Sequence, residues 1–244
     1  MLLGVDSSGW KPDETILIMP AISVGNVGQL AVDLLIQNLK LRYVGRVDGH
    51  DCTYSVVGSD PFGGEHLCTS FTAYQNEGMK VLVFQQRSDF LREKKKEYLQ
   101  RLMDWLTKCR FRAIFLLTSA FAYERTDVQM STNPLQYRLT PAAEEYLKDS
   151  KIQTEMCGAL KMDWPLSRGV DGGEKTRLLP GSGIAQALFE KCSQANLPLI
   201  VVSKYCSEGD NSMDSCQVAS VCAKLLGLPE VPKKWTIPKS WRAQ

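Results

Sequence analysis

Residues 20–29 constrain the fold of this chain more than any other stretch, because they join a predicted strand to a predicted helix. A nearly continuous apolar run precedes them at residues 15–19, which is typical of a strand buried on both faces. After them, apolar residues recur three or four positions apart as far as Leu39, which predicts a helix with one buried face. We predict Asn26 as the N-cap of this helix, with Gln29 completing a capping box. A strand, a glycine turn and a helix start in this order open an α/β fold.

The turn from Ser23 to Gly28 has two interpretations: it is either a ligand site or a structural scaffold, and these are called the ligand-site reading and the scaffold reading below. Free backbone N–H groups at a helix N-terminus attract anions, so the turn could hold a phosphate. It lacks, however, the Gly-Lys-Ser/Thr ending of a P-loop and the Gly-x-Gly-x-x-Gly spacing of a dinucleotide site. In the scaffold reading, Gly25 and Gly28 allow a tight turn and close packing of the helix on the sheet. We favour the scaffold reading, and we expect no cofactor and no small-molecule ligand.

The remaining pattern predicts a single α/β domain over residues 1–228, with a mixed central sheet between helices on both faces. Two β-favouring runs at residues 67–74 and 79–84 predict an antiparallel hairpin. A helix over residues 90–109 and a buried strand over 113–117 follow, and this order favours a right-handed crossover and a parallel pairing of the strands on either side of the helix. Thr140 and Pro141 predict a further helix start, as N-cap and first helical residue. Residues 168–173 read as an exposed, mobile loop within the domain.

Composition excludes several classes of function. The 244 residues carry a net charge of +2, which gives no general electrostatic reason to bind nucleic acid or a membrane. No apolar run approaches the ~20 residues of a membrane span, and the first residues do not resemble a secretion signal. The eight cysteines include no Cys-x-x-Cys pair, so we expect reduced thiols and a soluble protein of a reducing compartment.

No arrangement of side chains in the sequence predicts catalysis or metal binding. His50 and His66 are the only histidines, and neither has a second ligand at metal-binding spacing. Because both lie in or near predicted loops, we expect both to be exposed. Glu208 and Asp210 are better explained as capping a helix than as an acid–base pair. Residues 87–89 end a predicted strand, where α/β proteins bind ligands, but they have no catalytic companion. We therefore predict no catalytic residues and no metal site.

The C-terminal tail, residues 229–244, differs from the rest of the chain. Prolines at positions 229, 232 and 238 exclude a continuous helix, and Trp235, Trp241 and Arg242 make the tail amphipathic. Either it folds back over the domain and buries both indoles, or it forms an arm for a partner, because Trp and Arg are enriched among binding hot spots. We favour the packed reading for Trp235. For the last four residues both readings stay open.

Five separated stretches of the sequence together resemble one family. They lie at residues 19–33, 134–141, 179–184, 207–211 and 235–242. In this order and at this spacing they resemble the eukaryotic proteasome assembly chaperone 2 family. The likeness runs from the first predicted strand to the tail, and its first and last stretches are the most specific.

The resemblance implies a non-enzymatic chaperone of the 20S core particle, found in cytoplasm and nucleus. Such a chaperone pairs with the related proteasome assembly chaperone 1 as a heterodimer. The heterodimer binds proteasome α-type subunits, promotes correct α-ring formation and prevents off-pathway association of the ring. The resemblance also implies a three-layer α/β/α fold similar to nucleoside phosphorylases. In that fold Pro20, Gly25, Asn26 and Gly28 form a structural turn rather than a working pocket.

The sequence departs from this family at its last residues. A C-terminal hydrophobic-Tyr-any motif can insert into the α-ring in this family and its partner, whereas this sequence ends in Trp-Arg-Ala-Gln without that tyrosine. Docking through that motif would then rest with the partner or with residues that follow Gln244, and both alternatives stay open. The alternative to a chaperone comes from a different class of function. It is a small-molecule binder or an enzyme of phosphorylase or hydrolase type that uses the turn from Ser23 to Gly28.

Overall fold

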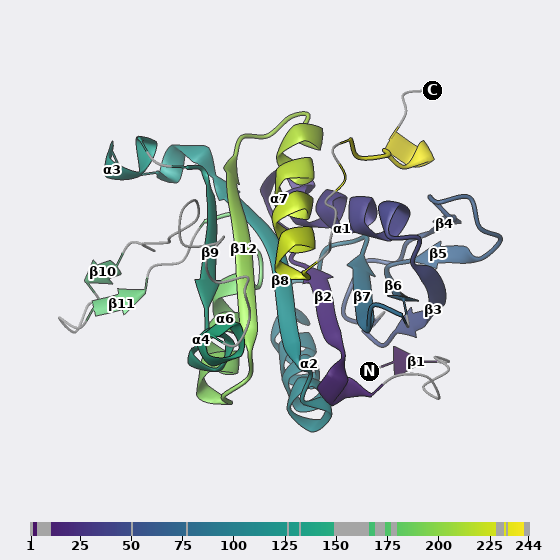
Figure 1. Ribbon diagram of the computed structural model, residues 1–244, viewed down its shortest axis with the longest axis horizontal. Helices are drawn as coiled ribbons and strands as arrows, with labels where there is room; N and C mark the ends of the chain where they lie inside the picture. Colours follow the sequence, from purple (N-terminus) through teal and green to yellow (C-terminus); the bar gives the residue numbers. More distant parts are fainter. Residues whose placement is uncertain are drawn as a thin grey trace.

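One eight-stranded mixed sheet with helices on both faces organises the fold (Figure 1). The computed structural model describes residues 2–3, 11–49, 51–76, 78–125, 127–131, 133–148, 166–168, 174–176, 180–227, 232 and 234–241. Within them the strands are β1 (Leu2–Leu3), β2 (Ile16–Pro20), β3 (Arg42–Val47), β4 (Val57–Ser59), β5 (Leu67–Thr69), β6 (Phe71–Asn76), β7 (Val81–Gln86), β8 (Ala113–Phe121), β9 (Leu135–Leu139), β10 (Leu166–Arg168), β11 (Glu174–Thr176) and β12 (Leu199–Cys206). The α-helices are α1 (Val27–Asn38), α2 (Lys95–Cys109), α3 (Asp127–Met130), α4 (Pro141–Lys148), α6 (Ala185–Gln194) and α7 (Ser212–Leu225).

The sheet has a parallel centre and antiparallel edges. Its strand order is β1-β3-β6-β7-β2-β8-β12-β9, and β7, β2, β8 and β12 run parallel to one another. The predicted hairpin is confirmed, because β6 and β7 pair antiparallel. The strands on either side of α2, β7 and β8, run in the same direction. The predicted pairing of these two strands is wrong, because β2 lies between them.

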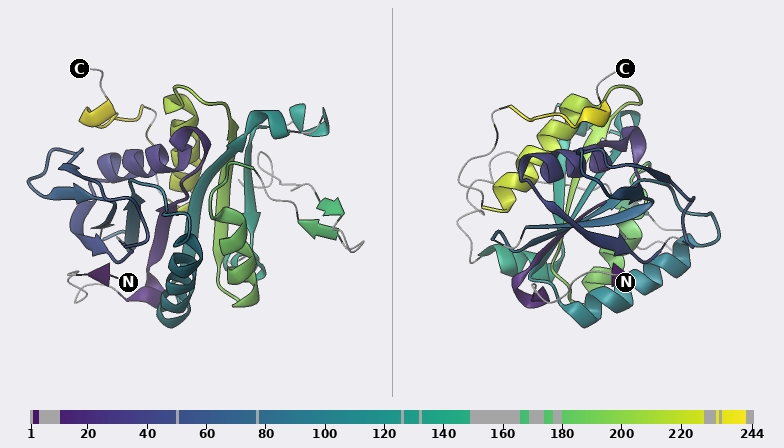
Figure 2. Two further views of the ribbon diagram at one scale, coloured as in Figure 1. Left: turned by 180° about the vertical axis from the view of Figure 1, so that it is seen from behind. Right: turned by 90° about the vertical axis from the view of Figure 1, so that its right-hand side faces the viewer.

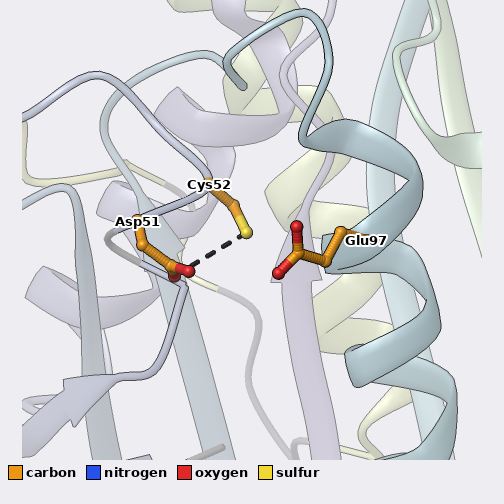
Figure 3. A group of neighbouring side chains, drawn as sticks. All are labelled: Asp51, Cys52 and Glu97. Atoms are coloured by element: carbon orange, nitrogen blue, oxygen red, sulfur yellow. Dashed lines mark hydrogen bonds between the residues drawn. The ribbon is translucent and has the colours of Figure 1, made fainter.

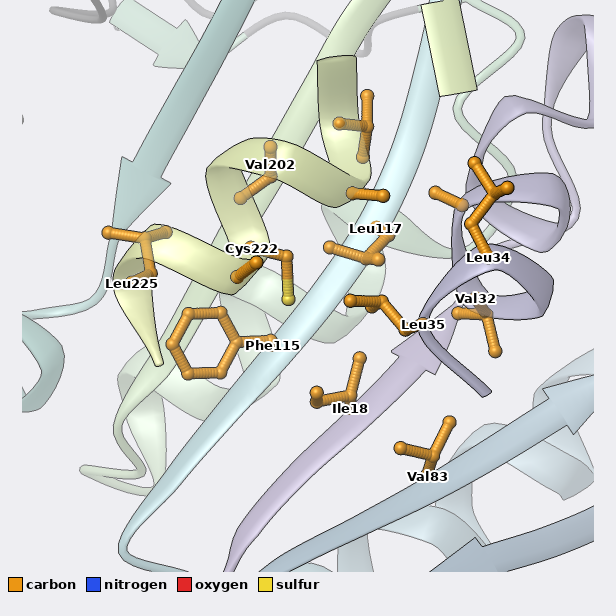
Figure 4. Close-up of a cluster of buried hydrophobic side chains, with 14 of the residues drawn as sticks. Ile18, Val32, Leu34, Leu35, Val83, Phe115, Leu117, Val202, Cys222 and Leu225 are labelled. Carbon is orange, nitrogen blue, oxygen red and sulfur yellow. The ribbon is translucent and has the colours of Figure 1, made fainter. Parts of the chain in front are cut away.

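Alternate side chains of the central strands enter two separate cores. Ile16 and Ile18 of β2 pack under α1 and α7, whereas Leu17 and Met19 pack under α2 and α6. The helices thus cover opposite faces of the sheet (Figure 2). Figure 4 shows part of the first core, where Leu35 of α1 and Cys222 of α7 face the sheet. Each fully buried aliphatic side chain of this kind contributes about 1.5–3 kcal/mol of transfer free energy. The predicted three-layer arrangement with a mixed sheet is confirmed.

Two elements differ from the sequence prediction. Helix α2 begins at Lys95, five residues later than predicted, because Phe90 forms a β-bridge with Thr53 and Lys94 closes a turn on Leu91. Strand β9 lies between the predicted strand and the helix start at Thr140, where we predicted no strand, and β8 continues to Phe121 rather than ending at residue 117. Leu135, Tyr137 and Leu139 do alternate with polar residues, but the strand forms only because β12 offers an edge.

Other predictions for the helices hold or fall outside the described residues. Helix α4 begins at Pro141, and the backbone N–H of Ala143 donates to Thr140 Oγ1 at 3.4 Å, which confirms Thr140 as the cap. The predicted loop at residues 168–173 lies outside the described residues, except for the end of β10. The described helices include none with the length and apolar character that a membrane span requires.

Candidate functional site

The turn at the start of α1 is built differently from the predicted capping box. Asn26 does occupy the N-cap position, but it has left-handed backbone angles (φ 55°, ψ 20°) and makes no side-chain capping bond. The Gln29 amide donates instead to the backbone oxygen of Gln86, at the end of β7. The capping-box prediction is therefore wrong, because Gln29 reaches sideways to the sheet rather than back to the helix start.

Both glycines of the turn lie where no side chain would fit. Gly25 has a φ of +62°, and a Cβ on it would be 2.3 Å from the amide nitrogen of Asn211. A Cβ on Gly28 would be 2.2 Å from the backbone oxygen of Leu117, since α1 crosses β8 at this point. Pro20 lies beside them as the last residue of β2, in register with Leu117. Close packing thus accounts for glycine at both positions.

The polar groups around the turn bind each other. The Ser119 hydroxyl lies 2.8 Å from Ser23 Oγ and 2.5 Å from the backbone oxygen of Val24. That oxygen also accepts from the Cys206 thiol, whose pKa is raised by burial, and the Val24 N–H donates to Gly181. An anion bound here would have to displace these contacts. The geometry therefore favours the scaffold reading over the ligand site.

Stretches that carry the family resemblance meet around α1, although they are far apart in the sequence. Asn211, from the stretch at residues 207–211, fills the space over Gly25. Gly183, from the stretch at 179–184, approaches the backbone of Ile22 so closely that a Cβ would be 2.1 Å from its oxygen. The last stretch reaches Asp33 through Trp241. These segments form one packed unit around the first helix.

A buried ion pair beside α1 is absent from the sequence prediction. Asp33, which is 2% exposed, accepts two hydrogen bonds from Arg87 at 2.6 and 2.7 Å and one from Gln85 at 2.6 Å. Burial alone would lower the pKa of Arg87, but the charge and hydrogen bonds of Asp33 outweigh it and raise that pKa. The signal was present, because Asp33 interrupts the apolar stripe of α1, and a buried carboxylate requires a partner.

The C-terminal strap, residues 234–241, folds back over α1 and α7 (Figure 1). Trp235 is buried, and its indole N–H donates to Ser220 Oγ at 3.0 Å. The indole N–H of Trp241, which is half-buried, lies 3.4 Å from Asp33 Oδ2. Trp235 thus lies where the packed reading puts it. Arg242 and the residues after it lie outside the described residues.

Asp51, Cys52 and Glu97 form a cluster with metal-ligand side chains, which the sequence did not indicate (Figure 3). Their ligand atoms lie within 4.8 Å of one another. Arg101, however, donates to both oxygens of Asp51 at 3.0 Å and also to Glu97. Burial and the charge of Asp51 raise the pKa of Cys52, which keeps the thiol protonated. Because Arg101 already binds the carboxylates of both Asp51 and Glu97, these residues form an ion-pair cluster in this structure.

His66, the one histidine among the described residues, is more buried than we predicted. We expected His66 to be exposed, but its side chain is only 20% exposed. It stacks on Tyr43 with ring centroids 3.9 Å apart and lies 3.5 Å from Asp60. Aromatic stacking thus buries a ring that the local sequence assigned to a loop. His50 lies outside the described residues.

Two surfaces expose large apolar side chains, and neither was predicted. The β4–β5 surface carries Tyr54, Val56, Val57 and Leu67, and Val57 and Leu67 are 71% and 56% exposed. Val57 pairs with Thr69, so these two side chains point to the same face of this small sheet. Leu67 lies two residues before Thr69 in β5, so its side chain points to that face as well. A hollow of about 250 Å³ adjoins it. Exposed apolar side chains gathered on one face make this surface a candidate interaction site.

The second surface, called the carboxyl-edge surface, lies where β8 and β12 end. It carries Tyr123 after β8, Met130 in α3 and Met213 in the first turn of α7. A groove of about 610 Å³ begins at Met213 and runs between α7 and β9 to Trp235 of the strap. Ligand and partner sites of parallel sheets commonly lie at this edge.

Comparisons with known proteins agree with the fold. The PAC2 family model matches residues 17–236. "Proteasome assembly chaperone 2" of Xenopus tropicalis is 35% identical over 99% of this chain and 95% of its own length, and the Homo sapiens protein of that name is 30% identical over 93% and 89%. The crystal structure of Pyrococcus furiosus PbaA, an archaeal homolog of proteasome-assembly chaperone, superposes with a TM-score of 0.62 at 17% identity, covering 94% of this chain and 86% of that one. P. furiosus PbaB, an archaeal proteasome activator, gives 0.61 at 14%, covering 94% and 90%. With its eight-stranded sheet, its packed first turn and these matches along nearly its whole length, the chain belongs to the PAC2 family.

Proposed function

We propose that this chain is a proteasome assembly chaperone of the 20S core particle. The observation that carries the proposal is identity of 30–35% over nearly the whole chain to proteins called proteasome assembly chaperone 2. In this proposal its role is to promote correct formation of the α-ring and to prevent off-pathway association. Its place of action in this proposal is the cytoplasm and the nucleus.

The chain acts, in this proposal, as one subunit of a heterodimer with the related proteasome assembly chaperone 1. The β4–β5 surface supports this, because exposed Val57 and Leu67 need cover and long-lived interfaces are the more apolar ones. A second partner, a proteasome α-type subunit, would then use another surface. The carboxyl-edge surface is available for it, because Met213 and Tyr123 remain exposed in the single chain.

The role is non-enzymatic in this proposal, as the names of the relatives suggest. The alternative, a small-molecule binder or a phosphorylase- or hydrolase-type enzyme at the turn from Ser23 to Gly28, has less support. Asn211, Ser119 and Cys206 already occupy the space and the polar groups of that turn.

Co-expression with the partner chaperone and α-type subunits tests the proposal. The tagged wild-type chain should capture both, and failure to capture either would contradict it. Val57→Asp combined with Leu67→Asp should abolish capture of the partner chaperone, since two carboxylates would be desolvated at the interface. Met213→Asp, an equally exposed apolar residue on the other surface, is the matched control and should keep the heterodimer. If both variants pair normally, the heterodimer forms elsewhere.

A further inference from the structure

The strap is attached to the domain by few groups, and they alternate regularly. Trp235 and Pro238 are buried and Trp241 is half-buried, whereas residues 236, 237, 239 and 240 are exposed. Every third residue therefore faces inward, which is the period of extended proline-rich chains and of the 3-10 turn at Lys239–Trp241. The strap docks through one narrow stripe and leaves most of its surface in water.

The backbone of the strap is held by a single side chain of α1. Asn38 accepts from the N–H of Thr236 at 2.9 Å and donates to its carbonyl oxygen at 3.0 Å. In the described part of the chain, the strap backbone has no other hydrogen bond to the domain. Asn38 thus replaces the ladder of bonds that a strand would make. We call this pair of bonds the Asn38 clamp.

The two indoles complete the attachment at either end. Trp235 is bound to Ser220 on α7, and Trp241 lies on the buried Asp33–Arg87 pair. Both indole hydrogen bonds join side chain to side chain, and the indoles also pack on the core under α1 and α7, with Trp235 as a member of that core. No backbone ladder ties the strap to a helix or a strand, and a segment without one opens more easily than the domain that carries it.

We propose that the strap is a latch with two states, closed on α1 and α7 or open and offered to a partner. The two are exclusive, because the inward stripe of Trp235, Pro238 and Trp241 carries the aromatic side chains that a partner would bind. The packed and partner-binding readings of the tail are then two states of one segment. This inference rests on the proposed function, with a proteasome α-type subunit as the receiver of the open strap.

The closed latch lowers the affinity of the strap for its receiver. When only a fraction of molecules is open, the apparent dissociation constant rises in inverse proportion to that fraction. Loosening the latch should therefore tighten binding. A strap that served as a fixed, preorganised docking element would behave in the opposite way, because freeing it would add an entropic cost to binding. The two cases therefore predict opposite changes in binding affinity when the strap is loosened.

Limited trypsin digestion of the whole chain tests the latch itself. The bond after Lys239 lies in the closed 3-10 turn, so cleavage there requires opening. Asn38→Ala removes the two bonds of the clamp and should raise the cleavage rate about tenfold or more, with the melting temperature nearly unchanged. Gln37→Ala, which removes the neighbouring amide of α1 but not the clamp, is the matched control and should leave the rate as in wild type. Equal rates in all three proteins would overturn the latch, as would cleavage that follows global unfolding.

Capture of co-expressed α-type subunits then tests the regulatory role. Asn38→Ala should capture them more tightly than wild type, Gln37→Ala equally, and a chain ending at residue 233 more weakly. Weaker or unchanged capture by Asn38→Ala would overturn the regulation, and so would full capture by the shortened chain. If wild type captures no α-type subunit at all, the proposed function fails and the regulatory role with it. The trypsin result still decides whether the latch exists.

Discussion

The turn at residues 23–28 leads into α1 and the strap at residues 234–241 packs on α1, but they are held in opposite ways. Backbone contacts hold the turn in addition to the side chains of Ser119 and Cys206, since Gly28 lies against the carbonyl of Leu117 and the Val24 N–H donates to Gly181. Side chains hold the strap, through Asn38 and two indoles. A segment fixed by backbone cannot leave without unfolding its neighbours, whereas one fixed by a few side chains can. Disturbing the turn should therefore affect the whole domain, and disturbing the strap only its own attachment.

The largest effect is expected at the ion pair that lies between the two regions. Asp33→Ala would leave Arg87 charged and buried without its carboxylate, which typically costs about 3–5 kcal/mol of unfolding free energy. Denaturant unfolding would measure it. Combining it with Arg87→Met should recover much of the loss, because the orphaned charge is gone. If the double variant is as unstable as the single one, the pair does not work as a unit.

A side chain at Gly28 of the turn should cause the second largest loss of unfolding free energy. Gly28→Ala would drive a methyl group against the Leu117 carbonyl and push α1 off β8, at a cost of about 3 kcal/mol. Gly58→Ala is the control, because no atom lies within 4 Å of its added Cβ and its effect should stay within about 0.5 kcal/mol. Similar losses for both glycines would mean that the close approach at Gly28 is not what requires glycine there.

Replacing Trp235 of the strap should lower the stability of the protein by less than the burial of its side chain alone would predict. Removing a buried aromatic side chain from a core usually costs about 3–5 kcal/mol. Trp235→Ala should cost less than this, because opening of the strap limits the loss to its own docking energy. Thermal unfolding measures the cost, and amide hydrogen exchange should show lost protection in residues 234–241 alone. A full core-sized loss would mean that the strap is as integral to the fold as the turn.

The smallest effect concerns the exposed ion pairs that Arg101 forms with Asp51 and Glu97, two residues of the cluster in Figure 3, which contrast with the buried pair at Asp33. The hydrogen bond from Arg101 lowers the pKa of Asp51 below its usual value. A lowered folded-state pKa contributes stability at neutral pH that is lost as the pH falls through that pKa. Arg101→Met should therefore flatten the decline in melting temperature below about pH 4. The difference should be small because both side chains reach solvent. An unchanged pH profile would show that the pair contributes nothing measurable.

Local pattern was sufficient for most of the fold. The apolar run before the turn, the stripe from Val27 to Leu39 and the hairpin were predictable because each follows from its own periodicity. Pairing across distance was not predictable in the same way. Strand β9 needed the edge of β12, and β2 inserted between β7 and β8, because register depends on which strands meet in space.

The same distinction between local sequence pattern and long-range contact applies to the candidate sites. The sequence alone determined the glycine turn, the unusual tail and the family resemblance, since all three are carried by residue type and spacing. Only the tertiary structure decided that Asp33 binds Arg87 and Trp241, that Asn38 holds Thr236, and that apolar side chains gather on β4 and β5. These contacts join residues far apart along the chain. Folding brings them together by burying the apolar faces between them, and no local pattern records which polar groups then meet.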